Sequence, residues 1–221
     1  MVSWVCRRYL MMPAHETACR APARAPPSYC WEFAMSSPRS PGQPRLSRET
    51  WLDFGLAVLR EDGPQALKAD PLCKRMGVSR GSFYWHFDSA ASFALAVLER
   101  WESVATDQII GSIALAATDA PARLHLLLSN VGQLDVGLYD AINTLGAQDP
   151  GAAQVLRRVH ERRVAFVASL LVEAGFEAPE AATRAQLIYA WAMGELLTRE
   201  AGRNAFSAAQ IEAVERLLMQ R

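Results

Sequence analysis

The chain has 221 residues, of which 51% are hydrophobic and 21% charged, and its 23 Lys and Arg balance its 23 Asp and Glu. This composition fits a globular protein of one or two domains, and it excludes a collagen, a disulfide-stapled miniprotein and a mostly disordered chain. No apolar run reaches the roughly 18 residues that cross a membrane. Arginines stand near the start, where a secretion signal needs its apolar stretch, so we expect a cytoplasmic protein without membrane contact.

The four cysteines and four histidines are spaced irregularly. Cys6, Cys19 and Cys30 lie close to the start, and Cys73 stands apart. Zinc sites need closely paired ligands, which these gaps do not provide, so we expect reduced thiols, no metal site and no cofactor. The sequence also lacks the nucleophile-elbow, zinc-protease, dinucleotide-binding and P-loop motifs, so we do not expect an enzyme.

Charge is distributed unevenly along the chain. Residues 1–46 hold six Arg and two acids, residues 47–100 hold seven basic and seven acidic residues, and residues 101–221 hold ten Arg and fourteen acids. A neutral segment followed by an acidic one indicates two functional parts.

The first residues carry no helical or strand period. Seven of the twelve prolines lie in residues 1–46, and prolines at that density interrupt regular structure. We expect residues 1–44 to be a disordered tail, or an over-long translation of a protein that begins near Met35. The alternative is a basic arm that follows DNA phosphates with Arg39, Arg45 and Arg48.

From Ser47 onward the apolar positions follow a helical period. Ser47 is the expected N-cap of a helix that ends near Gly63. Asp70-Pro71 has the form of an N-cap followed by Pro at the first helical position, and Gly77 breaks that short helix. Further helices are expected over Arg80–Phe87, from Ser89 to about Thr118, through Pro121–Leu128, through Tyr139–Leu145, from Asp149-Pro150 to Gly175, from Pro179 to Glu200 and from the Ser207 capping box to Leu218. No strand signal competes with them, which predicts an all-α fold.

The most informative segment is LCKRMGVSRGSFYWHF, residues 72–87. A helix-turn-helix needs a small residue where its two helices cross and a turn residue that accepts a left-handed backbone. Cys73 and Gly77 meet these two demands. Apolar side chains that lock the pair in place are Leu72, Met76, Val78 and Phe83. The rest of the second helix is polar and aromatic, a surface suited to groove edges and phosphates.

The run GVSRGSFYWHF resembles the recognition-helix signature of the TetR family of transcriptional regulators, and the resemblance extends over residues 45–105. It implies a helix-turn-helix DNA-binding domain at residues 45–95 and a helical ligand-binding and dimerisation domain at residues 96–221. The implied function is that of a homodimeric repressor, which binds a palindromic operator in double-stranded DNA and is released by a small apolar effector. The residues implied in DNA binding are Arg48, Lys68, Ser79, Arg80, Gly81, Ser82, Tyr84, Trp85 and His86.

Some positions depart from the family pattern. The family usually has Lys at the start of the helix after the recognition helix, where this chain has Ala90, so one phosphate contact is missing and a shallower salt dependence follows. Lys68 can supply the lost charge. Tyr84 could simply pack, and His86 could be a half-buried, hydrogen-bonded histidine. The rival function is a helical dimer that binds a small molecule or a protein and has lost specific DNA binding.

The second part of the chain holds the expected effector pocket and dimer interface. Pockets are mostly apolar with a few polar groups, and the ligand-binding candidates are Trp101, Gln133, Asn143 and Phe166, with His125 and His160 as further polar anchors. His160 lies in RRVHERR, which is typical of a solvated helical face. The dimer candidates are Leu187, Trp191, Gly194, Val214 and Leu218. For each residue the alternative is ordinary packing within one chain.

Overall fold

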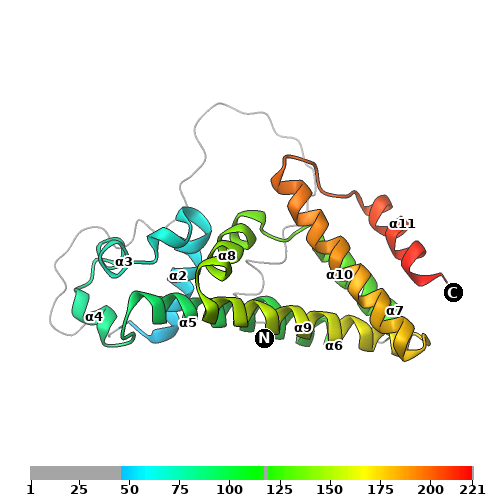
Figure 1. Cartoon of the computed structure of the whole chain (residues 1–221), viewed down its shortest axis with the longest axis horizontal. Helices are drawn as coiled ribbons and strands as arrows, with labels where there is room; N and C mark the ends of the chain where they lie inside the picture. The colour runs from blue at the N-terminus through cyan, green and yellow to red at the C-terminus, as the bar shows by residue number, and fades with distance from the viewer. Residues whose placement is uncertain (1–45, 117–118, 221) are drawn as a thin grey trace, which may run out of the picture.

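The computed structural model describes residues 46–116 and 119–220, so the predictions for residues 1–44 lie outside the described part of the chain. That part is helical and holds no strand, which confirms the all-α expectation. The helices form an elongated molecule, with α2 to α5 at one end and α7, α9, α10 and α11 toward the other (Figure 1). We call these two ends the head and the body.

The head consists of α2 (Arg48–Asp62), the short η2 (Pro64–Ala66), α3 (Ala69–Met76), α4 (Arg80–Tyr84) and α5 (Ala90–Glu102). Ser47 caps α2 as predicted, because its hydroxyl accepts a hydrogen bond of 3.1 Å from the Thr50 backbone N–H. Gly77 ends α3 with φ 63° and ψ 35°, a left-handed conformation that costs glycine little. Ser89 caps α5 in a capping box with Ser92.

Two boundaries in the head differ from the prediction. Lys68, not Asp70, is the N-cap of α3, so Pro71 is the third residue of the helix. Proline is tolerated there because the first backbone N–H groups of a helix have no partner within it. The α-helical part of α4 ends at Tyr84 and not at Phe87, and the chain turns through Trp85 instead.

Aromatic rings fill the centre of the head. Phe83 is fully buried and meets the rings of Trp51 and Phe93 edge-on, at centroid distances of 5.5 and 5.3 Å. Phe87 packs against Phe83 and Phe93 from the end of the same turn. Aromatic pairs of this geometry add to the free energy of burial. They fix the short α4 to α2 and α5, which one turn of helix could not achieve alone.

The helix that leaves the head continues into the body. After α5 the chain passes through a π-helical turn, η3 (Ser103–Asp107), into α6 (Gln108–Ala116). The predicted long helix is therefore present as far as Ala116, with a π-helical turn that the sequence pattern did not indicate. The remaining helices are α7 (Ala120–Val131), α8 (Val136–Gln148), α9 (Pro150–Glu173), α10 (Ala178–Glu200) and α11 (Ala208–Met219).

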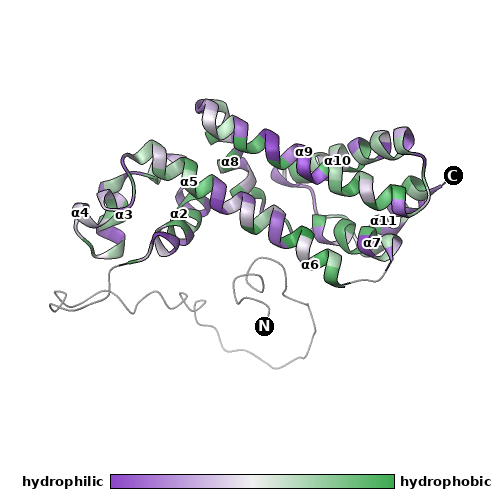
Figure 2. Ribbon diagram, turned by 90° about the horizontal axis from the view of Figure 1, so that it is seen from below, coloured by the Kyte–Doolittle hydropathy of each residue, from purple (hydrophilic) through white to green (hydrophobic). Residues whose placement is uncertain are grey.

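Local signals set most of the ends in the body. Asp149 caps α9 with a 2.8 Å hydrogen bond from the Ala152 N–H, and Ser207 with Gln210 forms the predicted capping box of α11. The N-cap of α7 is Asp119, two residues before the proline that marked its expected start. One buried cluster joins the head to α8 and the first half of α9, and a second joins α7, α9, α10 and α11. Hydrophobic residues crowd α6 and α7 in Figure 2.

Candidate nucleic-acid interface and ligand cavities

The helix-turn-helix is formed by α3, the turn at Gly77 and α4. The Val78 N–H donates to the Cys73 carbonyl at 3.0 Å, which closes the turn. The Cys73 thiol is buried and donates to the Ser79 carbonyl at 3.6 Å, and its burial raises the pKa of the thiol. Cys73 is therefore the small packing residue that the motif required.

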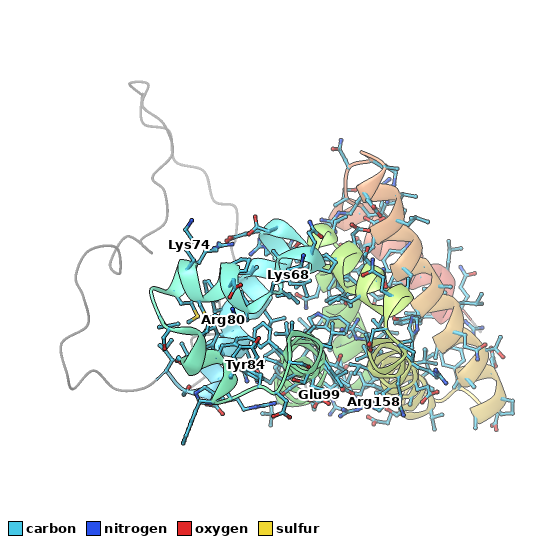
Figure 3. All side chains as sticks on the ribbon, turned by 60° about the vertical axis from the view of Figure 1, so that its left-hand side comes forward. Lys68, Lys74, Arg80, Tyr84, Glu99 and Arg158 are labelled. Carbon is cyan, nitrogen blue, oxygen red and sulfur yellow. The ribbon has the colours of Figure 1, made fainter. Side chains whose placement is uncertain are left out.

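Most of the predicted reading face is open to solvent. Ser79, Arg80 and Gly81 are exposed, Tyr84 is 47% exposed and Trp85 69% exposed. Ser82 and His86 are half-buried. Figure 3 places Lys74, Arg80 and Tyr84 on the head, separate from Arg158 on α9. A Tyr and a Trp exposed next to each other at the end of a short helix are costly in water, which indicates a surface that meets a partner.

Arg80 and His86 have partners within the chain. Arg80 Nε lies 2.9 Å from Asp70 Oδ1 of α3, and its guanidinium lies 5.8 Å from the centre of the Tyr84 ring. Hydrogen bonding to Tyr84 and then the charge of Asp70 raise the pKa of Arg80. His86 Nε2 lies 2.8 Å from the Leu46 carbonyl, so the imidazole ties the end of α4 to the segment before α2. This geometry fits the alternative of a half-buried, hydrogen-bonded histidine.

The cations of the head fall into two groups. Arg75 is paired with Glu61 at 2.8 Å and with Asp62, and Arg100 is paired with Asp53. In contrast, Lys68 and Lys74 are exposed and form no ion pair within the described residues. The Arg48 guanidinium lies over the Phe87 ring at 5.3 Å. Lys74 is a cation that the sequence reading missed, because the run of two cations in LCKRMG does not show which one faces acids.

The structure contains two neighbouring cavities. The first lies where the head meets the body, and the second lies within the body. The first has a volume of about 660 Å³, open space at its mouth included, and Trp101 and Gln133 line it, together with Leu56 of the head. The second has a volume of about 740 Å³ by the same measure, and Phe166 lines it between α6, α7, α9 and α10. Ala105 and Asn130 belong to both walls. The predicted residues thus divide between two adjacent spaces.

The other polar candidates lie elsewhere. Asn143 is exposed on α8 and lines neither of these cavities. Asn143 was predicted to line the pocket only because it is polar. In the structure the neighbouring Ile142 of α8 faces the interior instead. His125 is exposed and pairs with Glu215 at 2.7 Å, which links α7 to α11. His160 is exposed on α9, with its ring 4.5 Å from that of Tyr189.

The sequence suggested that the segment RRVHERR is a solvated helical face, but only part of it faces solvent. Arg158 pairs with Glu102 at 2.8 Å and Arg162 with Asp107 at 2.6 Å. Arg163 is half-buried and lines the second cavity. Its Nε donates to Thr106 Oγ1 at 3.1 Å, and its Nη2 donates to the Ala105 carbonyl at 2.8 Å. Arg163 was missed because the run RRVHERR holds four arginines, and the sequence does not show which of them faces the interior.

The predicted dimer residues occupy two different environments. Leu187 is 57% exposed on α10, and a Cβ added at Gly194 would meet nothing within 4 Å. Leu197, farther along this face, is 67% exposed. Trp191 and Leu218 are half-buried and pack against the second core cluster. Val214 on α11 is also half-buried.

Within residues 46–116 and 119–220 no cluster of three or more His, Cys, Asp or Glu side chains is arranged to hold a metal ion. No helix in the same ranges has both the length and the apolar character needed to cross a bilayer.

Part of the head matches a known protein family. Residues 52–97 match the family described as bacterial regulatory proteins, tetR family. The chain is 30% identical over 102 residues to the transcriptional regulator AcuR of Cereibacter sphaeroides, and the match spans 46% of each chain. It therefore covers about half the length of that curated relative.

Solved structures share the fold across most of the chain. A transcriptional regulator of the TetR/AcrR family has a TM-score of 0.67 at 21% identity, with 77% of this chain and 97% of that chain covered. Reduced NemR of E. coli has a TM-score of 0.63 at 19% identity, with coverages of 78% and 95%. FadR of Bacillus subtilis in complex with stearoyl-CoA has a TM-score of 0.60 at 15% identity, with coverages of 79% and 98%. At these identities the similarity shows the fold alone.

Proposed function

We propose that this chain, whose residues 52–97 match the tetR family, is a ligand-responsive transcriptional repressor that binds a palindromic operator as a homodimer. The observation that carries the proposal is the exposed end of α4, where Tyr84 and the C-cap residue Trp85 face solvent while Phe83 packs in the core. A DNA-binding regulator of this kind acts in the cytoplasm, and its regulatory relatives give no reason to expect an enzyme.

In the proposed complex α4 enters the major groove. A recognition helix of a helix-turn-helix presents its N-terminal residues to the base edges, while the preceding helix crosses the backbone. Ser79, Arg80, Gly81 and Ser82 are then nearest the bases, with Trp85 beside them. Arg80 must leave Asp70 to reach a base. The pair is exposed, and exposed pairs are weak, so DNA competes with it effectively.

Phosphate contacts come from the edges of the head. Lys68 and Lys74 are exposed without an acidic partner in the described chain, and Arg48 stands at the start of α2. Tyr84 adds a hydroxyl to this set. His86 acts through its bond to Leu46, which holds the first turn of α2 against the end of the reading helix. These contacts position the head and carry no sequence information themselves.

A single head of this size buries little surface, so specificity requires two copies in successive major grooves, about 34–36 Å apart. The exposed Leu187 and Leu197 on α10, with open space over Gly194 on the same helix, support a two-fold interface there, because a second copy would cover these leucines. Trp191, Val214 and Leu218 would support this interface from beneath.

The effector is proposed to bind in the two cavities of the body and to act by a population shift. Leu56 of α2 lines the first cavity, and α5 runs through η3 into α6, which lines both. An apolar molecule that fits these spaces better in one head orientation shifts the equilibrium by its differential affinity. The structural relative FadR, solved with stearoyl-CoA, supports an apolar effector.

Gel shift on the DNA upstream of the chain's own gene tests the proposal. The wild-type chain is expected to shift this DNA in the presence of non-specific competitor, and a Tyr84→Ala, Trp85→Ala double variant is expected to lose at least about tenfold in affinity. Leu115→Ala is the matched control, since Leu115 is 90% exposed in the body. No shift at low salt would favour the rival function, a helical dimer that has lost specific DNA binding. Two features are consistent with that rival: Ala90 in place of the family's Lys, and the pairing of Arg80 with Asp70.

A further inference from the structure

One cation in the body stands beside apolar surface without an acidic partner. Arg163 lines the second cavity, and no carboxylate of the described residues lies within ion-pair distance of its guanidinium. The adjacent arginines of the same helix differ, because Arg158 and Arg162 both reach Glu102, and Arg162 also reaches Asp107. The position nearest the cavity is thus the one that lacks a counter-charge.

The bonds of Arg163 hold it at the cavity wall but leave its charge uncompensated. Three of its five N–H groups reach neutral oxygens, those of Thr106, Tyr139 and the Ala105 backbone. Its guanidinium also lies 5.2 Å from the centre of the Trp101 ring. A partly desolvated cation with only neutral partners is electrostatically costly, and an anion brought to it recovers that cost.

The surroundings suit a molecule with one acidic end and an apolar remainder. Apart from Arg163, Thr106, Asn130 and Tyr189, the wall of the second cavity is apolar, with Ile109, Leu127, Phe166 and Met193 among its residues. Tyr189 lies on the same wall, and burial raises its pKa to about 12. Its hydroxyl therefore stays protonated at neutral pH and can donate a hydrogen bond to an anion. Asn130 shares the wall, although its amide already donates to the Leu126 carbonyl.

We propose that the second cavity binds an organic acid with an apolar chain, whose carboxylate is held by Arg163 and Tyr189 and whose chain lies against Phe166 and Met193. The inference rests on the proposed function, since it names the chemical class of the effector. The planar guanidinium matches a carboxylate in two parallel hydrogen bonds, which a neutral head group cannot form.

The site has a direct connection to the head. Arg163 grips η3 through the Ala105 carbonyl and the Thr106 hydroxyl, and η3 continues α5 of the head. Two N–H groups of Arg163, one on each Nη, remain for a carboxylate. A bound acid would therefore contact the same side chain that holds the π-helical turn, and π-helical turns within helices are frequently found at functional sites.

Calorimetric titration of the full chain tests the ligand class. The probes are sodium octanoate and, as neutral molecules of the same chain length, octan-1-ol and methyl octanoate, all at neutral pH. The wild-type chain is expected to bind octanoate at least about tenfold more tightly than either neutral probe. Arg163→Gln is expected to lose this preference, and Arg163→Lys to keep part of it because the charge remains.

Arg162→Gln is the matched control, because Arg162 neighbours Arg163 on α9 but is 49% exposed and pairs with Asp107. It should leave the preference unchanged. If Arg163→Gln fails to fold, the proposal is still tested by the affinities of the wild-type chain and of Arg163→Lys for octanoate and for the neutral probes. Equal affinity for acid and alcohol, no binding of octanoate or its shorter and longer homologues, or an equal loss in Arg162→Gln would each overturn the proposal.

These outcomes are separable from those of the proposed function. DNA binding is measured on the chain without any added acid, so a failed octanoate preference leaves the DNA-binding result intact. Conversely, a chain that prefers octanoate but shifts no DNA would overturn the repressor and retain the ligand site.

Discussion

The role of Lys74 gives a quantitative test of how the head contacts DNA. Lys74 is exposed on α3 without an ion pair in the described chain, on the helix that crosses the backbone in a helix-turn-helix complex. Each phosphate neutralised by a cation steepens the fall of log K with log salt by about 0.9. Lys74→Gln should therefore make the slope shallower by about 0.9. Between about 50 and about 200 mM salt, the affinity ratio of wild type to variant should shrink by about 3.5-fold.

Fluorescence anisotropy of a labelled operator across this salt range measures the slope. Arg75→Gln is the charge-matched control, since Arg75 is the next residue but is held by Glu61 and Asp62. The Arg75→Gln variant loses the same charge as Lys74→Gln but no expected phosphate contact. The slope of log K against log salt should therefore stay near that of the wild type. Equal slopes for Lys74→Gln and the wild type, or an equal change in both variants, would refute the assignment of Lys74 to a phosphate.

Three further predictions address the interface, the core and the response to pH. Leu187→Glu combined with Leu197→Glu should convert a dimer to a monomer in light scattering, and an unchanged mass would place the interface elsewhere. Gly55→Ala should lower the free energy of unfolding by about 1–3 kcal/mol, because its Cβ would lie 2.5 Å from Val97 Cγ2; an unaltered denaturant midpoint would argue against this packing. Partial desolvation of its exposed side chain, and then the charge of Arg163, lowers the pKa of His160 from 6.5, so its contribution to stability is present above that pH and is lost as the pH falls below it. His160→Gln should flatten the acid side of the stability profile, and an unchanged profile would contradict this.

Helix ends were predictable wherever the signal is local. Ser47, Gly77, Asp149 and Ser207 act within a few residues of their own helix end, through a side-chain oxygen or a left-handed backbone. The helix-turn-helix was predictable for the same reason, because the small Cys73 and the turn glycine are neighbours in sequence. The structure confirms these elements, and predicting them required no knowledge of tertiary contacts.

Features set by contacts between distant segments were not predictable. Lys68 rather than Asp70 is the N-cap of α3, two residues after η2 ends, and the local Asp-Pro signal does not indicate this. The π-helical turn η3 gives no signature in the apolar pattern of residues 89–118. Asn143 and Arg163 exchanged their expected roles, since a helical period fixes which residues share a face but not how far each side chain reaches. Periodicity alone therefore gave the helices but not the cavity walls.

Selection of bound sequences from a random pool of double-stranded DNA tests the central claim most directly. The account predicts that the full chain enriches a palindrome whose half-sites lie one helical turn apart, and that the Tyr84→Ala, Trp85→Ala variant enriches none. Enrichment of no sequence by the wild-type chain, or of an asymmetric site that the double variant binds equally well, would contradict it.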